Sequence, residues 1–174
     1  MIDLFLPNEQ IKEVYDINPE QLTELGIKGL VVDLDNTLIP WNVSYASPKV
    51  RAWFDSIITG NIQVIVFSNN QPDRVATFAY PIGLPYIAKA KKPLTKSFKS
   101  ACEQMDLDVN EVAIVGDQLL TDIFGGNMAG LYTILVDPIV KSDAPITQFN
   151  RKIEGLLLKR FYKKGQLARR QIND

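Results

Sequence analysis

The 174-residue sequence contains no histidine and only one cysteine, Cys102. Without histidine, imidazole-based catalytic triads, phosphohistidine chemistry and histidine-ligated zinc sites are all excluded. A single cysteine cannot form an internal disulfide, and the residues after Cys102 include three acids and no cation that would lower its thiol pKa. Any metal chemistry must therefore use oxygen ligands, which favours ions of the magnesium type.

The sequence also lacks an apolar run long enough to span a membrane. The first ten residues, MIDLFLPNEQ, carry an acid at position 3 and no long apolar core, so we expect no signal peptide and a cytoplasmic location. A hydrophobic fraction of 46% and a charged fraction of 22% are typical of a globular protein, and the length favours one domain with or without a tail.

Apolar runs that end in polar turns alternate with segments of helical spacing. Continuous β-branched runs of this kind are typical of strands buried on both faces of a sheet. The alternation predicts an α/β fold, a doubly wound, Rossmann-like parallel sheet with right-handed crossovers. The expected strands are GLVVDLD at 29–35, IQVIVFSNN at 62–70, EVAIVGD at 111–117 and LYTILVD at 131–137, and the expected helices between them are 47–60, 94–105 and 121–130.

Charge is distributed unevenly along the chain. Residues 151–174 hold eight basic residues against two acids, whereas the residues before them hold eleven basic residues against eighteen acids. We expect a lead-in at 1–27 packed on a core at 28–150, followed by a basic helix or tail at 151–174. The tail interleaves cations with apolar side chains, so it either binds an anionic membrane surface peripherally or forms a surface helix with a frayed basic end. No base-stacking module is visible, so we expect no nucleic-acid partner, and the oligomeric state stays open.

Polar side chains follow the ends of three predicted strands. Asp33 and Asp35 follow the first, Ser68 and Asn69 the second, and Asp117 the third. Because the carboxyl ends of parallel strands meet at one edge of a sheet, we expect these side chains to lie together. Several carboxylates at one point repel each other unless a cation lies between them, and Mg²⁺ binds carboxylate, carbonyl and water oxygens. The pattern predicts a magnesium site.

The stretch AKAKKPL at 88–94 supplies lysines to the same edge. The proline that follows Lys92 restrains that residue to an extended conformation, which favours Lys92 over Lys91 as the lysine of the site. A divalent ion, a lysine, a hydroxyl and backbone N–H groups together are typical of a phosphate site. In such a site Asp33 can attack phosphorus to form an aspartyl-phosphate, while Asp35 transfers protons to the leaving oxygen and from the attacking water.

The order of these features resembles that of a known superfamily. DLDNT at 33–37 is similar to the first motif, D-x-D-x-T/V, of the haloacid dehalogenase (HAD) superfamily, and GDQLLTD, with Asp117 and Asp122, to its fourth. Ser68 matches the second motif and Lys92 the third, so the resemblance covers residues 28–137. DLDNTLIPW, SNN, AKKP and GDQLLTDIFGGN together resemble the YqeG-type subgroup of the class III phosphatases in this superfamily.

This resemblance implies a magnesium-dependent phosphomonoester phosphatase. In the family, the second aspartate binds the metal through its backbone carbonyl, and the aspartate at position 122 supports the metal waters or the lysine. We add two candidate substrate-binding residues from the first and second motifs. The resulting assignments are catalysis for Asp33, Asp35, Ser68 and Lys92, metal binding for Asp33, Asp35 and Asp117, substrate binding for Thr37 and Asn69, and support for Asp122.

The spacing between motifs bears on the substrate. Only 30 residues separate Thr37 from Ser68 and 23 separate Ser68 from Lys92, too few for a cap domain. An uncapped site suits large or surface-held phosphate esters, because the substrate itself must exclude water. The resemblance implies a lipid phosphate such as phosphatidylglycerophosphate, which related mitochondrial proteins dephosphorylate. A soluble phosphometabolite, a receiver-like signalling domain and a phosphate-binding scaffold without turnover are the alternatives.

Overall fold

The structure, a computed structural model, describes residues 2–140 and 145–167, with the backbone alone for 145–149 and 151. Its centre is a six-stranded, wholly parallel sheet with the strand order β1-β6-β5-β2-β3-β4. The fold prediction of a parallel α/β sheet is therefore confirmed. The strands are β1 (Glu9–Gln10), β2 (Gly29–Asp33), β3 (Gln63–Phe67), β4 (Tyr86–Ile87), β5 (Val112–Gly116) and β6 (Tyr132–Leu135).

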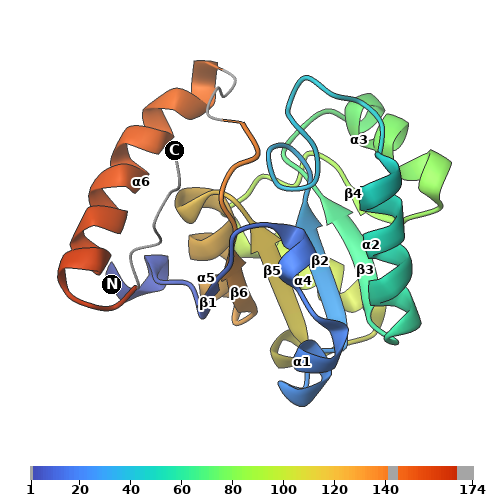
Figure 1. The fold of residues 1–174 in the computed structure, drawn as a ribbon, viewed down its shortest axis with the longest axis horizontal. Helices are drawn as coiled ribbons and strands as arrows, with labels where there is room; N and C mark the ends of the chain where they lie inside the picture. Colours follow the sequence, from blue (N-terminus) through green and yellow to red (C-terminus); the bar gives the residue numbers. More distant parts are fainter. Residues whose placement is uncertain (1, 141–144, 168–174) are drawn as a thin grey trace.

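Helices cover both faces of the sheet (Figure 1). On one face, Leu30 and Val32 of β2 pack in a core with α1 (Pro19–Glu24), α2 (Pro48–Thr59) and α3 (Pro72–Ala79). On the other face, Val31 packs in a second core with α4 (Thr95–Met105) and α5 (Phe124–Ala129). Because side chains alternate along a strand, β2 is buried on both sides and is held rigidly at its carboxyl end.

The sequence of α2 contains a capping residue at its start and an apolar stripe along one face. Ser47 caps it, with its Oγ accepting a hydrogen bond from the backbone N–H of Val50 at 3.2 Å, and Pro48 occupies the first turn. The apolar stripe that includes Trp53, Phe54 and Ile57 is buried against the sheet. The helix thereby leads the chain from the carboxyl edge of β2 back to the start of β3.

The helix after β5 differs from the expected one, which began at Thr121. It begins with a π-helical turn, η5 (Leu119–Ile123), and continues as α5. Side chains satisfy the N–H groups of this first turn, because Glu154 Oε1 accepts from Leu120 at 3.1 Å and Asp122 Oδ2 accepts from Gln118 at 3.2 Å. The wide turn carries Asp122, and π-helical turns of this kind are frequent at functional sites.

The two ends of the described chain pack on the sheet. The lead-in contributes η1 (Ile2–Phe5), the edge strand β1, η2 (Val14–Asp16) and α1. The C-terminal helix α6 (Pro145–Lys163) places Leu157 and Leu158 against η5, and Phe161 is fully buried. The division that we expected after residue 150 therefore falls inside one helix, and the last seven residues of the basic tail lie outside the described residues. Within the described residues, no helix is both long enough and apolar enough to cross a bilayer.

Candidate active site

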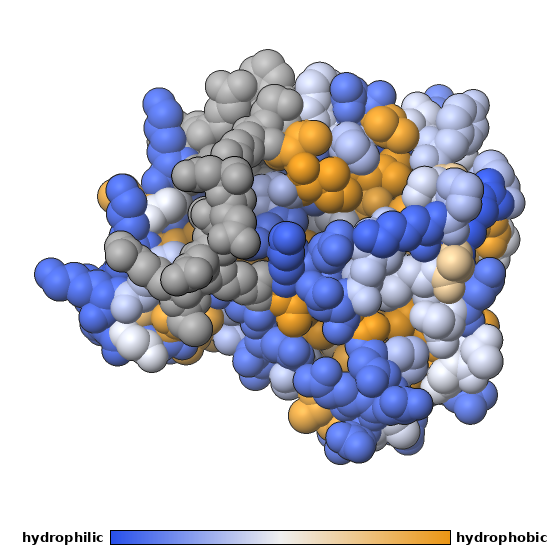
Figure 2. Space-filling model, viewed as in Figure 1, coloured by the Kyte–Doolittle hydropathy of each residue, from blue (hydrophilic) through white to orange (hydrophobic). Residues whose placement is uncertain are grey.

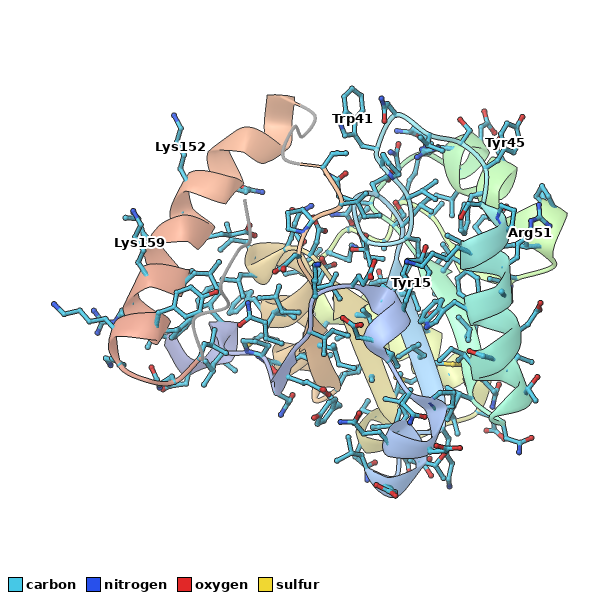
Figure 3. The ribbon with its side chains drawn as sticks, in the orientation of Figure 1. Tyr15, Trp41, Tyr45, Arg51, Lys152 and Lys159 are labelled. Carbon is cyan, nitrogen blue, oxygen red and sulfur yellow. The ribbon has the colours of Figure 1, made fainter. Side chains whose placement is uncertain are left out.

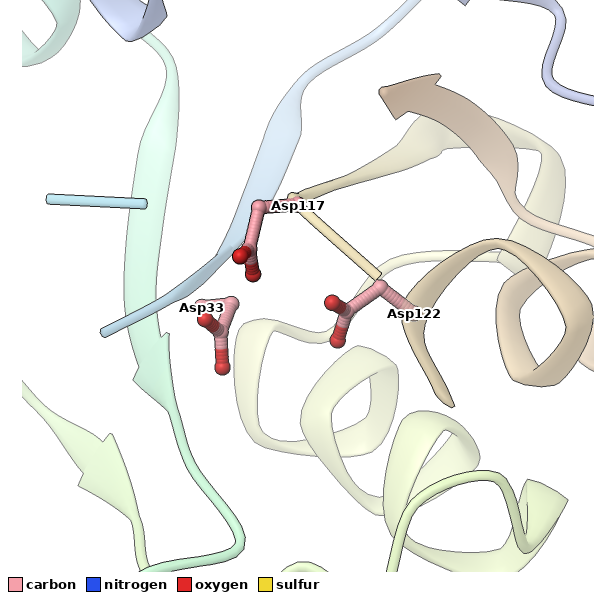
Figure 4. A group of neighbouring side chains, drawn as sticks. All are labelled: Asp33, Asp117 and Asp122. Carbon is pink, nitrogen blue, oxygen red and sulfur yellow. The ribbon is translucent and has the colours of Figure 1, made fainter. Parts of the chain in front are cut away.

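Three buried carboxylates meet at the carboxyl edge of the sheet (Figure 4). Asp33 is the last residue of β2, Asp117 follows β5 directly, and Asp122 lies on η5. Each offers a carboxylate oxygen within 4.8 Å of one from each of the others. The predicted convergence of Asp33 and Asp117 is thus present in the structure, and Asp122 joins them directly.

Lys92 lies at the centre of this group. Its Nζ is 2.5 Å from Oδ1 of Asp33 and 2.7 Å from Oδ1 of Asp122, and it donates to the carbonyl of Phe67 at 3.3 Å. Burial opposes the charge of Lys92, but Asp122 and Asp33 overcome that penalty and hold the pKa of Lys92 above its usual value. Lys91, the alternative left open by the sequence, is exposed. The structure therefore places Lys92, as a cation, against the carboxylates.

The other oxygen of Asp33 has no such partner. Oδ2 is buried and has no hydrogen-bond partner among the described residues. Burial raises the pKa of Asp33 well above its usual range, and the nearby charges of Asp122 and Asp117 add to the rise while Lys92 opposes it. A buried carboxylate oxygen without a donor is unfavourable, and an all-oxygen donor set is what Mg²⁺ prefers. The residues present thus fit a divalent ion of the magnesium type.

A glycine gives Asp122 its place in the cluster. A Cβ atom at Gly116 would overlap the side chain of Asp122, so only glycine permits this approach. Oδ2 of Asp122 accepts the backbone N–H of Gln118, while its Oδ1 faces Lys92. We expected Asp122 to support either the metal waters or the lysine, and in the structure it contacts the lysine directly.

The two residues that we predicted to bind substrate contact other members of the site. Thr37 is buried, and its hydroxyl donates to Oδ1 of Asp117 at 3.3 Å. The exposed Asn69 accepts the backbone N–H of Lys92 at 2.7 Å and donates to its carbonyl at 3.3 Å. Their position makes each of them a support for a charged neighbour, and substrate binding by either remains a prediction.

Ser68 lies where the sequence predicts, directly after β3. It is buried, and its Oγ accepts the backbone N–H of Asn70 at 3.0 Å. This bond uses the hydroxyl as an acceptor, so the hydroxyl proton is not engaged by it. The hydroxyl can therefore donate to a phosphate oxygen.

Asp35 stands apart from the carboxylate cluster. Its Oδ1 lies 2.8 Å from Nη2 of Arg74, and its Oδ2 accepts from Asn70 at 3.3 Å. Neither Arg74 nor Asn70 was predicted from the sequence to belong to the site. The available signal was Pro72, which marks a helix start beside the carboxyl end of β3, so that first-turn side chains reach the same edge.

Comparisons with known proteins find phosphatases among the relatives of this chain. A family model described as HAD-hydrolase-like matches residues 89–154. A Bacillus subtilis protein named "Probable phosphatase YqeG" is 44% identical over 163 residues, which cover 94% of this chain and 95% of that protein. Phosphatidylglycerophosphate phosphatase 1 of Arabidopsis thaliana is 28% identical over 170 residues, which cover 92% of this chain but 49% of that longer protein.

A solved structure shows the same fold. The cobalt-bound deoxy-D-mannose-octulosonate 8-phosphate phosphatase of Haemophilus influenzae superposes with a TM-score of 0.55 at 14% identity. The match covers 78% of this chain and 89% of that one. At this level of identity, the likeness concerns the fold alone.

Proposed function

The chain belongs to the YqeG-type phosphatases of the HAD superfamily, and from that premise we propose that it hydrolyses phosphate monoesters with Mg²⁺ through an aspartyl-phosphate on Asp33. The observation that carries this proposal is the state of Asp33. One oxygen of that buried carboxylate is held by Lys92, and the other has no hydrogen-bond partner among the described residues. Such a carboxylate is fixed in place and has lone pairs left for a metal and for phosphorus.

Asp33 and Asp117 would hold the ion, with the backbone carbonyl of Asp35 as the further ligand that the family resemblance implies. Asp122 lies close enough to take part, although its Oδ1 is engaged with Lys92. When bound, Mg²⁺ supplies positive charge that offsets both the carboxylates and the phosphoryl oxygens.

Protein side chains carry out the nucleophilic attack, the proton transfers and the binding of the phosphoryl group. Asp33 attacks phosphorus while the ester P–O bond breaks, and Asp35 gives its proton to the leaving oxygen. Asp35, now a carboxylate, takes a proton from a water molecule that attacks the phosphorus, and the bond to Asp33 breaks to release inorganic phosphate. Lys92 and the hydroxyl of Ser68 bind the phosphoryl oxygens throughout.

The test uses a generic aryl phosphate. We expect Asp33→Asn to abolish turnover of 4-nitrophenyl phosphate in Mg²⁺ while circular dichroism and the melting profile stay those of a folded protein. EDTA should remove wild-type activity and excess Mg²⁺ should restore it. Wild-type rates in Asp33→Asn, or activity that is indifferent to EDTA, would contradict the proposal.

We propose further that the substrate is a phosphate ester held at a lipid surface, of the kind in the name of the Arabidopsis relative. Support comes from the rim of the site. Trp41, Val43 and Tyr45 follow Asp35 on one loop and are 41%, 39% and 64% exposed, and Leu94, two residues after Lys92, is 61% exposed. Trp41 and Tyr45 lie at the end of the molecule where the strands finish (Figure 3), and apolar surface gathers in the same region (Figure 2).

Such a rim suits a membrane interface, because tryptophan and tyrosine favour the boundary between lipid and water. We expect phosphatidylglycerophosphate in mixed micelles to be turned over faster than soluble sugar or nucleotide phosphates. Trp41→Ser with Tyr45→Ser should slow the lipid reaction selectively. Tyr80→Ser is the matched control, because Tyr80 is 72% exposed but lies after α3, outside the loop that carries Trp41 and Tyr45, and packs against Tyr86 of β4. Equal rates on lipid and soluble substrates in all variants would contradict the lipid proposal.

The basic tail is tested separately. Removing residues 168–174 deletes Arg169 and Arg170 but keeps the buried Phe161 of α6. If the tail contributes to membrane attachment, this truncation reduces sedimentation with anionic vesicles and leaves turnover of soluble aryl phosphate unchanged. Unchanged sedimentation would show that Arg169 and Arg170 do not contribute, and would leave attachment to the rim and to the basic residues that precede position 168.

A further inference from the structure

Arg74 is a charged residue of this site to which the proposed reaction assigns no role. It lies in the first turn of α3, and its side chain is 16% exposed. Its Nη2 is 2.8 Å from Oδ1 of Asp35 and donates to the carbonyl of Trp41 at 3.3 Å. One guanidinium nitrogen thus joins α3, Asp35 and the rim loop.

Asp35 is held from a second direction. Asn70 donates to its Oδ2 at 3.3 Å, and the backbone N–H of Asn70 donates to Oγ of Ser68 at 3.0 Å. Both oxygens of the carboxylate therefore have donors from the segment that follows β3. This arrangement fixes the orientation of Asp35 relative to Ser68, which is proposed to bind the phosphate.

The two aspartates of the first motif each have their own cation. Asp33 pairs with Lys92 inside the cluster, whereas Asp35 pairs with Arg74 at its mouth. Asp35 is absent from the group of carboxylates whose oxygens lie within 4.8 Å of one another. A fourth carboxylate in that group would add repulsion and would take Asp35 away from the leaving oxygen, so the contact with Arg74 has a chemical consequence.

The geometry of Arg74 is unusual for an arginine with a purely structural role. Its Nε is buried and has no hydrogen-bond partner among the described residues, and its contact with Asp35 uses a single nitrogen. Buried arginines normally satisfy their donors, often with a bidentate carboxylate. The side chain is therefore held in this place by Asp35 and Trp41 in spite of an unsatisfied N–H group.

We propose that Arg74 is a positioning residue that orients Asp35 for proton transfer to the leaving oxygen. This inference rests on the proposed role of Asp35 in the phosphatase reaction. It has a specific kinetic consequence. Protonation of the leaving group matters for an alkyl phosphate, whose alkoxide is a poor leaving group, and hardly at all for 4-nitrophenyl phosphate.

The experiment compares kcat/KM for the two substrate types, because this parameter reports phosphoenzyme formation and not its later hydrolysis. In Arg74→Gln we expect kcat/KM for an alkyl phosphate such as glycerol 3-phosphate to fall about tenfold to a hundredfold, at or below the lower end of the roughly 10²–10⁴-fold contribution of a general acid, because Asp35 itself is retained. The value for 4-nitrophenyl phosphate should change by less than about threefold. The ratio of kcat/KM for 4-nitrophenyl phosphate to kcat/KM for the alkyl phosphate should therefore rise. Arg74→Lys keeps a cation and should give a ratio between those of the wild type and Arg74→Gln.

Arg51→Gln is the matched control. Arg51 is an exposed arginine on α2 that donates to the carbonyl of Pro81 at 3.3 Å, and its substitution should leave the ratio unchanged. An unchanged ratio in Arg74→Gln, or an equal loss on both substrates, would overturn the role of Arg74. If Arg74→Gln does not fold by circular dichroism, the ratio in Arg74→Lys decides, and a wild-type ratio there overturns the inference as well.

The two proposals fail in different ways. If the wild type turns over neither substrate, or if Asp33→Asn keeps its activity, the phosphatase mechanism itself is wrong. If turnover depends on Asp33 but the ratio does not respond to Arg74, only the positioning role is wrong.

Discussion

Lys92 and Asp122 form a fully buried ion pair, with 2.7 Å between Nζ and Oδ1 and side chains that are 3% and 0% exposed. The same ammonium lies 2.5 Å from Asp33, so one cation serves two buried carboxylates. A buried charge requires a close opposite charge, because the interior solvates it poorly. The cluster is therefore held together by Lys92. With Asp117 included, three ionised carboxylates face one ammonium, so the cluster is two positive charges short, which a divalent cation would supply.

The first prediction concerns this lysine. Lys92→Met leaves Asp33 and Asp122 buried without their cation, and we expect a loss of about 3–5 kcal/mol in the free energy of unfolding, measured by urea denaturation in EDTA. Turnover should be lost as well. Lys91→Met is the control, because Lys91 is exposed and its substitution should stay within about 0.5 kcal/mol of the wild type. Equal effects of the two substitutions would show that the buried contacts are not the source of stability.

The second prediction concerns metal binding. The carboxylates of Asp33, Asp117 and Asp122 repel each other, so we expect a divalent ion to bind between them in the folded state. An ion that binds only the folded state should stabilise it by about 2.7 kcal/mol when its concentration is a hundred times its Kd. We expect Mg²⁺ to raise the melting temperature of the wild type and to raise that of Asp117→Asn much less. Asp55→Asn, at an exposed acid on α2, should respond as the wild type does. A wild-type response in Asp117→Asn would place the ion elsewhere.

The third prediction follows from the raised pKa of Asp33. A carboxyl group whose pKa is higher in the folded state binds its proton more tightly there. Its contribution to the stability of the fold is therefore complete below the pKa of the unfolded state, about 3.9, and is lost as the pH rises through the pKa of the folded state. In EDTA, the wild type should therefore lose stability relative to Asp33→Asn as the pH rises from about 4 towards neutrality. The raised pKa of Lys92 keeps that group charged across this window.

The measurement is the difference in the free energy of unfolding between the two proteins at a series of pH values. Mg²⁺ should reduce the pH dependence of this difference, because the ion competes with the proton for the carboxylate. Parallel curves in EDTA would show that Asp33 does not titrate differently in the folded and unfolded states.

Much of the site could be predicted because it depends on strand ends. Asp33, Ser68 and Asp117 each follow a continuous apolar run, and parallel strands bring their carboxyl ends together whatever the details of packing. Lys92, which the proline after it favoured over Lys91, lies against two carboxylates, although these contacts depend on a loop path that has no periodicity. The two-residue strands β1 and β4 are too short to produce any periodic pattern, so they were not predicted.

Contacts between side chains distant in sequence could not be predicted from one sequence. The hydrogen bond that the backbone N–H of Lys92 donates to Asn69 spans 23 positions, and the pair of Arg74 with Asp35 spans 39. Glu154 shows the same limit, because it accepts a hydrogen bond from Leu120, 34 positions away, and so joins α6 to the π-helical turn that carries Asp122. Charge and spacing predicted a basic helix or tail, either bound to a membrane surface or lying on the protein surface, but not the buried Glu154.

The last prediction compares the same chemical change at two glycines. A methyl group at Gly116 would overlap the side chain of Asp122, which cannot move without leaving Lys92 and the N–H of Gln118. We expect Gly116→Ala to lower the free energy of unfolding by about 1–3 kcal/mol, as overpacked cores do, and to reduce turnover strongly. A methyl group at Gly155 of α6 meets nothing within 4 Å, so Gly155→Ala should stabilise the protein by about 0.5–1 kcal/mol through helix propensity.

Urea denaturation and turnover of 4-nitrophenyl phosphate check both variants. Both variants add one methyl group, but we expect them to change the free energy of unfolding in opposite directions. This difference separates the close approach at Gly116 from any general effect of replacing glycine by alanine. If Gly116→Ala kept wild-type stability and activity, Asp122 would have to leave the position in which it holds Lys92. The buried ion pair would then be dispensable for both the fold and the reaction.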